Sequence, residues 1–178
     1  LTGNWTVSFW MKRLGSGTGD FPQVIGSRPW TAGLDKGWAV AWDSSGNKIC
    51  SHYADGSTGF DVNSGSTCSS SSSTLNSFEY WTVVFDRTNS QLRYYKSGGI
   101  DVTNSKTYTT GSVNQSDAVN IGREIGGANN RRLNAVLDEV RVSNAVRSAA
   151  WIAAEYKSEV DTFNTFASEE PRIATSGT

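Results

Sequence analysis

The chain has 178 residues, which suits one domain with a sizeable core, and 37% of these residues are hydrophobic. Its formal net charge is −1, so it lacks the basic field that attracts nucleic acid or anionic lipid, and we expect no nucleic-acid partner. No apolar run approaches the roughly 20 residues of a membrane-spanning helix, so we also expect no membrane insertion.

Short segments in which apolar and polar residues alternate follow one another along the chain. This period of two is typical of β-strands, and turn-forming sequences such as DSSGN and RTNS separate the segments. The candidate strands cover residues 4–12, 22–27, 37–43, 48–54, 79–86, 91–96, 106–110, 118–124 and 133–142. So many short strands predict an all-β sandwich or barrel, and the large aromatic residues of inward parity favour a two-sheet antiparallel β-sandwich.

After the last candidate strand the period changes from that of a strand to that of a helix. Ser148 can cap a helix, and Trp151, Ile152, Glu155 and Tyr156 follow it at helical spacing. We therefore expect one short helix near the C-terminus.

The end of the chain differs in composition from the rest. The last residues, ASEEPRIATSGT, are mostly polar. We therefore assign residues 1–166 to the domain and residues 167–178 to a polar tail, or to a linker that leads to other domains of a larger protein.

The chain contains two cysteines, Cys50 and Cys68. The Ser- and Gly-rich stretch 54–74 has few apolar side chains, so we expect a disulfide between these cysteines to keep it ordered. Two unrelated free thiols are the alternative. Because disulfides persist in oxidising compartments, we expect an extracellular or cell-surface protein.

Five segments of the chain resemble, in their order, the laminin-G-like, concanavalin-A-like jelly-roll modules of secreted bacterial proteins. These segments are WTVSFWMK, GWAVAWD, EYWTVVFDRTNSQLRYY, VNIGRE and LDEVRVSNAVRSAAWIAAEY. The resemblance extends to about Tyr156, and its last segment is the most specific, because in this family a short helix follows the last strand. It implies a concanavalin-A-like jelly roll with one short C-terminal helix.

The resemblance also implies a structural metal ion. Related modules often hold Ca²⁺ through a carboxylate near the start of the last strand, and Asp138 matches this position. By parity Asp138 lies with Val136 and Val140 on the inward face, where a charge needs a partner. That partner is Ca²⁺, as the resemblance implies, or a basic side chain, or backbone N–H groups, and the sequence leaves the choice among them open.

The sequence does not contain a complete set of catalytic residues. A retaining glycoside hydrolase needs two carboxylates about 5 Å apart, whereas Asp138 and Glu139 are adjacent in a strand and point to opposite faces. His52 is the one histidine, and the chain has no Gly-x-Ser-x-Gly elbow. We therefore expect that the protein is not an enzyme.

Strand parity separates core aromatic residues from candidate ligand-binding residues. Trp38, Trp42 and Trp81 share faces with Val and Phe, so we assign them to the core. The candidate ligand-binding residues are Trp10, His52, Arg93 and Tyr95, which have the outward parity, and Trp30, which lies in the loop SRPWTAGLDKG. The alternative for each is a residue that a neighbouring loop or the C-terminal helix covers.

These features together favour a non-catalytic carbohydrate-binding module of a secreted or surface protein. We expect it to bind a polysaccharide or glycan weakly, through exposed aromatic side chains. The alternative is a protein-binding, adhesion or structural module of a surface appendage or virus particle. The fold alone does not separate these functions, because function depends on the sites that the fold carries.

Overall fold

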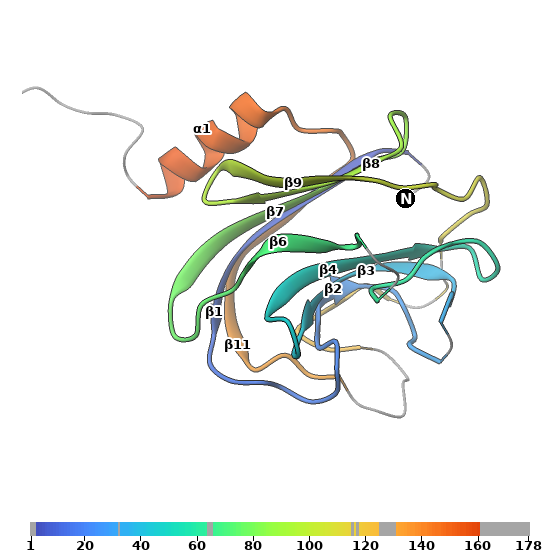
Figure 1. Ribbon diagram of the computed structural model, residues 1–178, viewed down its shortest axis with the longest axis horizontal. Helices are drawn as coiled ribbons and strands as arrows, with labels where there is room; N and C mark the ends of the chain where they lie inside the picture. Colours follow the sequence, from blue (N-terminus) through green and yellow to red (C-terminus); the bar gives the residue numbers. More distant parts are fainter. Residues whose placement is uncertain are drawn as a thin grey trace, which may run out of the picture.

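The computed structural model describes residues 3–31, 33–63, 66–114, 116, 118–124 and 131–160. Two antiparallel sheets face each other as the layers of a sandwich, and helix α1 (Ala149–Glu159) lies outside them (Figure 1). The predicted all-β, two-sheet sandwich with a short C-terminal helix is confirmed.

The two sheets are built from strands that are distant in sequence. The five-stranded sheet has the order β11-β1-β7-β8-β9, from β11 (Ala135–Ser143), β1 (Trp5–Arg13), β7 (Phe78–Asp86), β8 (Gln91–Lys96) and β9 (Gly99–Ser105). The six-stranded sheet has the order β10-β2-β3-β4-β5, from β10 (Asn120–Ile121), β2 (Gln23–Gly26), β3 (Gly37–Asp43), β4 (Lys48–Ala54) and β5 (Gly59–Phe60), and β6 (Cys68–Ser72) also pairs with β4.

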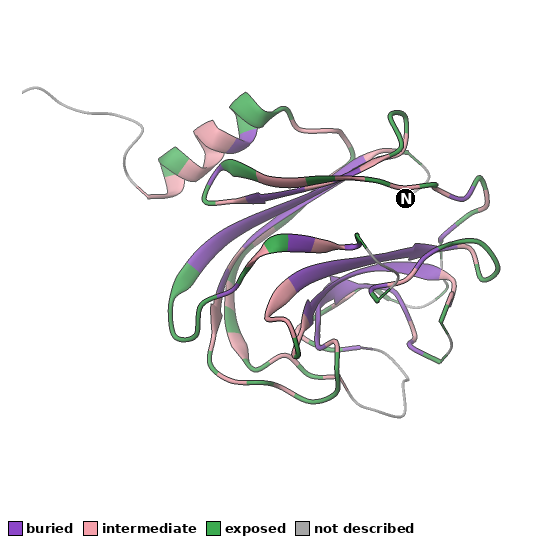
Figure 2. Ribbon diagram, in the orientation of Figure 1, coloured by how far each residue is buried: buried purple, intermediate pink, exposed green. Residues whose placement is uncertain are grey.

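The core between the sheets consists largely of aromatic side chains. Trp5 of β1 stacks on Phe85 of β7, with ring centroids 4.6 Å apart, and meets Trp38 of β3 edge-on at 6.2 Å. Trp42 and Trp81 are also fully buried, which confirms the core assignment made from parity. Figure 2 shows the buried central strands of both sheets. Burial of these large rings removes much apolar surface from water and so stabilises the fold.

Helix α1 covers part of the outer face of the five-stranded sheet. The Ser148 hydroxyl caps it by accepting a hydrogen bond from the Trp151 backbone N–H at 3.2 Å. Ile152 is fully buried, and it packs with Val84 and Tyr95 of the sheet. The predicted cap and helix are therefore confirmed.

One predicted strand is misplaced. Residues 106–110 form no strand, and β9 precedes them instead. The turn between β8 and β9 places Ser97 (φ 50°) and Gly98 (φ 77°) in the left-handed region, which is the geometry of a tight hairpin, so the chain returns at once. β9 was missed because its sequence GIDVTNS is largely polar and lacks clear alternation.

Because β11 contains a β-bulge, the orientation of Asp138 differs from the predicted one. The register with β1 shifts between Ser8 and Trp10, opposite Glu139, whose φ is 49°. The extra residue reverses the alternation, so Leu137 packs on the core before the bulge and Val140 after it. Asp138 is consequently exposed, and its predicted inward position is wrong.

Candidate functional site

The outer face of the six-stranded sheet carries a second, smaller apolar cluster beneath two loops, which the structure describes at residues 27–31 and 33–36 and at residues 61–63 and 66–67. Trp30 and Val62 come from these loops, and they pack on Ala39, Ala41 and Cys50 of the sheet. A pocket of about 320 Å³ opens at this cluster, and we call it the Trp30 pocket. The residues that line it include Asp20, Phe21, Arg28, Trp30, Asp61 and Arg131.

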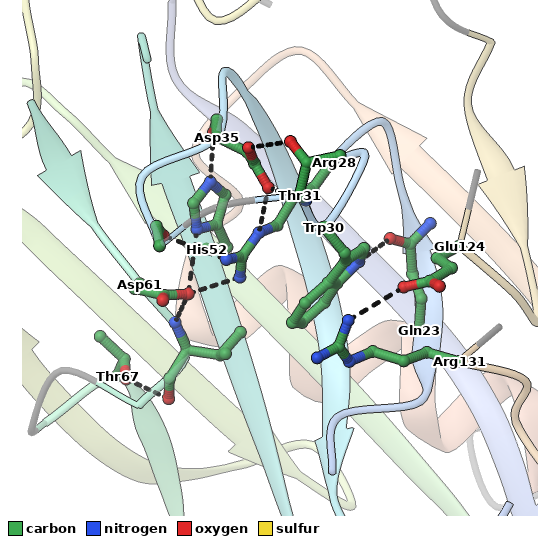
Figure 3. Close-up of polar contacts among 12 residues, drawn as sticks. Gln23, Arg28, Trp30, Thr31, Asp35, His52, Asp61, Thr67, Glu124 and Arg131 are labelled. Atoms are coloured by element: carbon green, nitrogen blue, oxygen red, sulfur yellow. Dashed lines mark hydrogen bonds and ion pairs between the residues drawn. The ribbon is translucent and has the colours of Figure 1, made fainter. Parts of the chain in front are cut away.

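Trp30 is built into the wall of this pocket. Its indole Nε1–H donates to the Gln23 side-chain oxygen at 2.9 Å, and the guanidinium carbons of Arg28 and Arg131 lie 3.9 Å and 4.5 Å from its ring centroid. Its backbone is left-handed (φ 58°), a conformation that a bulky residue keeps only when its surroundings hold it. Trp30 is 8% exposed, so the predicted exposed aromatic residue is wrong: two cations cover the ring (Figure 3).

Arg28 is held by acidic and backbone groups of the same loops. Its Nη1 pairs with Asp61, its Nη2 donates to the Gly33 carbonyl at 3.0 Å, and its Nε lies 3.8 Å from the Asp35 carboxylate. Burial lowers the pKa of Arg28, and the Asp61 and Asp35 carboxylates partly offset this effect. Asp35 also accepts hydrogen bonds from the backbone and hydroxyl of Thr31, at 2.5 Å and 2.7 Å. Arg28 therefore ties both loops together.

His52 of β4 lies beneath these loops and has no exposed surface. Its Nε2 is 2.7 Å from the Asp35 backbone carbonyl, and its Nδ1 is 3.3 Å from the Asp61 carboxylate. Burial lowers the pKa of His52, and the hydrogen bond with Asp61 only partly offsets the effect. Both partners of the ring are acceptors, so the neutral form donates to one of them only. Its side chain faces outward from the sandwich core, yet the predicted accessibility is wrong because the loops cover it.

The buried His52 predicts a pH dependence of stability. Its folded-state pKa is below the unfolded value of about 6.5, so the unfolded chain binds more protons in this range. The contribution of His52 to the free energy of unfolding should therefore be constant above about pH 6.5. As the pH decreases from about 6.5 to the lowered pKa, this free energy should decrease by up to about 1.4 kcal/mol per pH unit. Urea unfolding between pH 7.5 and 5 measures this slope, and His52→Gln is the control. Equal slopes in the two proteins would contradict the prediction.

A second ion pair closes the other side of the pocket. Arg131 Nη1 lies 3.2 Å from the Glu124 carboxylate, whose side chain is 2% exposed. Among the described residues, Arg131 Nε and Glu124 Oε1 have no hydrogen-bond partner. The Gln23 side-chain nitrogen donates to the Arg123 carbonyl at 3.1 Å and so connects Trp30 to the segment that carries Glu124. The pocket thus brings together residues that are distant in sequence.

The other predicted site residues lie on the opposite sheet. Tyr95 is 2% exposed beneath α1, Trp10 contacts the rings of Tyr80 and Tyr156 at 5.3 Å and 5.9 Å, and Arg93 pairs with Asp86 at 2.6 Å. The prediction that Tyr95 is exposed is therefore wrong, because the helix covers it. The structure brings His52 and Trp30 together, and it does not bring Trp10, Arg93 or Tyr95 to them.

The disulfide between Cys50 and Cys68 is confirmed. The two residues are direct partners in the β4–β6 pair, and both contribute to the apolar cluster beneath Trp30. The Cys68 sulfur also lies 3.4 Å from the Val62 carbonyl oxygen, so the disulfide supports the loop that carries Asp61.

Asp138 is exposed, and the hydrogen bond that its carboxylate accepts lies within its own strand. Asp138 Oδ1 accepts a hydrogen bond from the Glu139 backbone at 2.8 Å, and the Glu139 carboxylate pairs with Arg141 at 2.5 Å. The described part of the chain has no cluster of three or more His, Cys, Asp or Glu side chains that could hold a metal ion. Calcium binding at Asp138 remains a prediction that rests on the family resemblance.

The two-layer fold is an antiparallel β-sandwich module with a pocket on its outer face. Residues 1–153 match the laminin-G-type family described as the concanavalin A-like lectin/glucanases superfamily, and the chain belongs to this family. No curated protein matches the chain significantly in sequence. Among the described residues, no helix is long and apolar enough to cross a membrane.

Solved structures share this fold at low sequence identity. A Bacteroides ovatus protein assigned as carbohydrate binding is 14% identical, with a TM-score of 0.63 over 85% of this chain, which spans 40% of that protein. The CBM40 of a Ruminococcus gnavus IT-sialidase, bound to α2,3-sialyllactose, is 11% identical, with a TM-score of 0.60 over 86% of this chain and 83% of that one. A heptameric SAP-like pentraxin from Limulus polyphemus is 14% identical, with a TM-score of 0.59 over 87% and 70%.

Proposed function

We propose that the protein is a non-catalytic carbohydrate-binding module and that its Trp30 pocket holds a glycan. The observation that carries the proposal is the pocket itself, in which the half-buried ring of Phe21 lies beside guanidinium and carboxylate groups. Apolar sugar faces pack on aromatic rings, and sugar hydroxyls both donate and accept hydrogen bonds. A concave site with a few fixed polar groups suits such a ligand. The superfamily and the carbohydrate-binding proteins of similar fold support the same function.

The state of Asp61 supports binding rather than hydrolysis. Burial alone would raise the pKa of Asp61, but the hydrogen bonds to its carboxylate and the charge of Arg28 prevail and lower it. A glycosidase needs a carboxylic acid with a raised pKa to protonate the leaving group. Asp61 is therefore ionised at neutral pH and serves as a hydrogen-bond acceptor. We place such a module in a secreted or surface protein, which the disulfide supports.

The proposal predicts that Phe21→Ala weakens glycan binding by about tenfold or more, since it removes the accessible ring of the pocket. A glycan array followed by calorimetry on the best ligand measures the effect. Phe78→Ala is the matched control, because Phe78 is 49% exposed on the other sheet, and it should bind like the unmodified protein. Failure of the unmodified protein to bind any glycan would refute the proposed function.

The alternative function, a protein-binding or adhesion module, is favoured by one observation. Apolar side chains are exposed along edge strand β11 and on α1: Val136 by 43%, Val142 by 46% and Trp151 by 37%. Edge strands and apolar patches are common protein contacts. If no glycan binds and a defined protein ligand is lost with Val142→Lys, this alternative replaces the carbohydrate proposal.

A further inference from the structure

The charges around the Trp30 pocket indicate which class of sugar it takes. We infer that the pocket binds an uncharged sugar and discriminates against a sugar that carries a carboxylate. This inference rests on the proposed function, and it adds the chemical class of the ligand.

The two arginines that line the pocket are already neutralised by the protein. Arg28 pairs with Asp61 and lies 3.8 Å from Asp35, and Arg131 pairs with Glu124 at 3.2 Å. All three carboxylates belong to buried or half-buried residues, so water screens these pairs only weakly. An incoming carboxylate would therefore meet guanidinium groups that already hold an anion.

The pocket lining carries as many acidic as basic side chains. Asp20 and Asp61 line the pocket together with Arg28 and Arg131, and the carboxylates of Asp35 and Glu124 lie behind the two arginines. Asp20 is exposed at the rim and pairs with no basic side chain of the described residues. Because like charges placed together disfavour binding, the exposed Asp20 carboxylate at the rim opposes an acidic ligand.

Hydrogen-bond chemistry leads to the same conclusion. A sugar hydroxyl can donate to a carboxylate and accept from a guanidinium at the same time, whereas an ionised carboxylate can only accept. The site offers both partners side by side, because Arg131 uses one terminal nitrogen for Glu124 and its other terminal nitrogen points away from Glu124 (Figure 3). Neutral hydroxyl groups match this mixed lining, and a carboxylate matches only half of it.

The experiment compares ligands that differ in charge alone. The best glycan from an array of neutral and acidic oligosaccharides is converted at C6 to its uronic acid and, separately, to its uronamide, and calorimetry measures both affinities. The unmodified protein should bind the uronamide at least about tenfold more tightly than the uronic acid. Added salt should reduce this ratio of affinities. Two variants should also reduce this ratio of affinities. Glu124→Gln releases Arg131 from its ion pair, and Asp20→Asn removes the exposed negative charge.

Each outcome decides the inference. Equal affinities for the two derivatives, or an array on which acidic glycans bind most tightly, would overturn it and leave the proposed function standing. Binding of no glycan would overturn both. Because Glu124 is buried, a urea unfolding curve first establishes that Glu124→Gln is folded, and Asp20→Asn supplies the same test at an exposed position.

Discussion

Replacing Trp30 by Ala is expected to lower the free energy of unfolding by about 3–5 kcal/mol, the range for removal of a buried Trp side chain. Trp30 is 8% exposed and forms the centre of the apolar cluster on the six-stranded sheet. Its loss also leaves the Gln23 side-chain oxygen without its donor at 2.9 Å and uncovers one face of the Arg28 and Arg131 guanidinium groups. Urea unfolding at pH 7 measures the effect.

Two further variants test whether the loss comes from the pocket wall. Trp151→Ala is the matched control, because Trp151 is 37% exposed on α1, and it should change stability by less than about 1 kcal/mol. Trp30→Phe keeps a ring but removes the indole N–H, so it should lose about 1–3 kcal/mol. If Trp30→Ala unfolds at the same urea concentration as Trp151→Ala, then the loops do not depend on Trp30.

Removal of the disulfide is expected to destabilise the protein by about 3 kcal/mol, the chain-entropy value for a loop of this size. The sequence separation of Cys50 and Cys68 is 18 residues. Most of the polar stretch between β4 and β6 lies in this loop, and the loop also carries Asp61, which pairs with Arg28. The double variant Cys50→Ala/Cys68→Ala should therefore lose glycan affinity as well as stability.

Reduction of the unmodified protein provides an independent measurement. A reducing agent should shift its unfolding midpoint towards that of the double variant, and it should not shift the midpoint of the double variant itself. Alkylation of two thiols in the folded, non-reduced protein, detected by intact mass, would contradict the disulfide. An unchanged midpoint on complete reduction would show that the link does not stabilise the folded state.

Much of the fold could be predicted from local sequence because the signals are periodic. Trp5, Val7 and Phe9 alternate with polar or surface positions, and burial of their side chains sets the orientation of β1. Ser148 followed by Trp151 and Ile152 similarly predicted α1 and its cap. The errors occurred where the backbone departs from a regular period. The bulge at Glu139 turned Asp138 outward, and β9 has too few apolar residues to be recognised.

The candidate site was predicted less well than the fold. Parity placed His52 on the outer face correctly, but parity does not reveal that a loop covers that face. Asp35 and Asp61 lie near Trp30 and His52 in the sequence. They could have been considered as partners of Arg28, because a guanidinium group beside a buried aromatic residue needs a counter-charge. Arg131 could not have been found in this way, because it reaches Trp30 only through the packing of a distant segment.

The sequence by itself determined the class of the fold, the core strands, the terminal helix and the disulfide pair, because alternation, capping and thiol number are local or compositional properties. Tertiary structure alone decided which outward-facing side chains remain accessible to solvent and which of them contact one another. Long-range packing places Trp30 and Val62 of the two loops over the sheet and Arg131 against Trp30. For this reason Trp30, which was predicted to be exposed, is buried in the wall of a charged pocket. Such contacts depend on the three-dimensional path of the whole chain, and no spacing along the sequence encodes them.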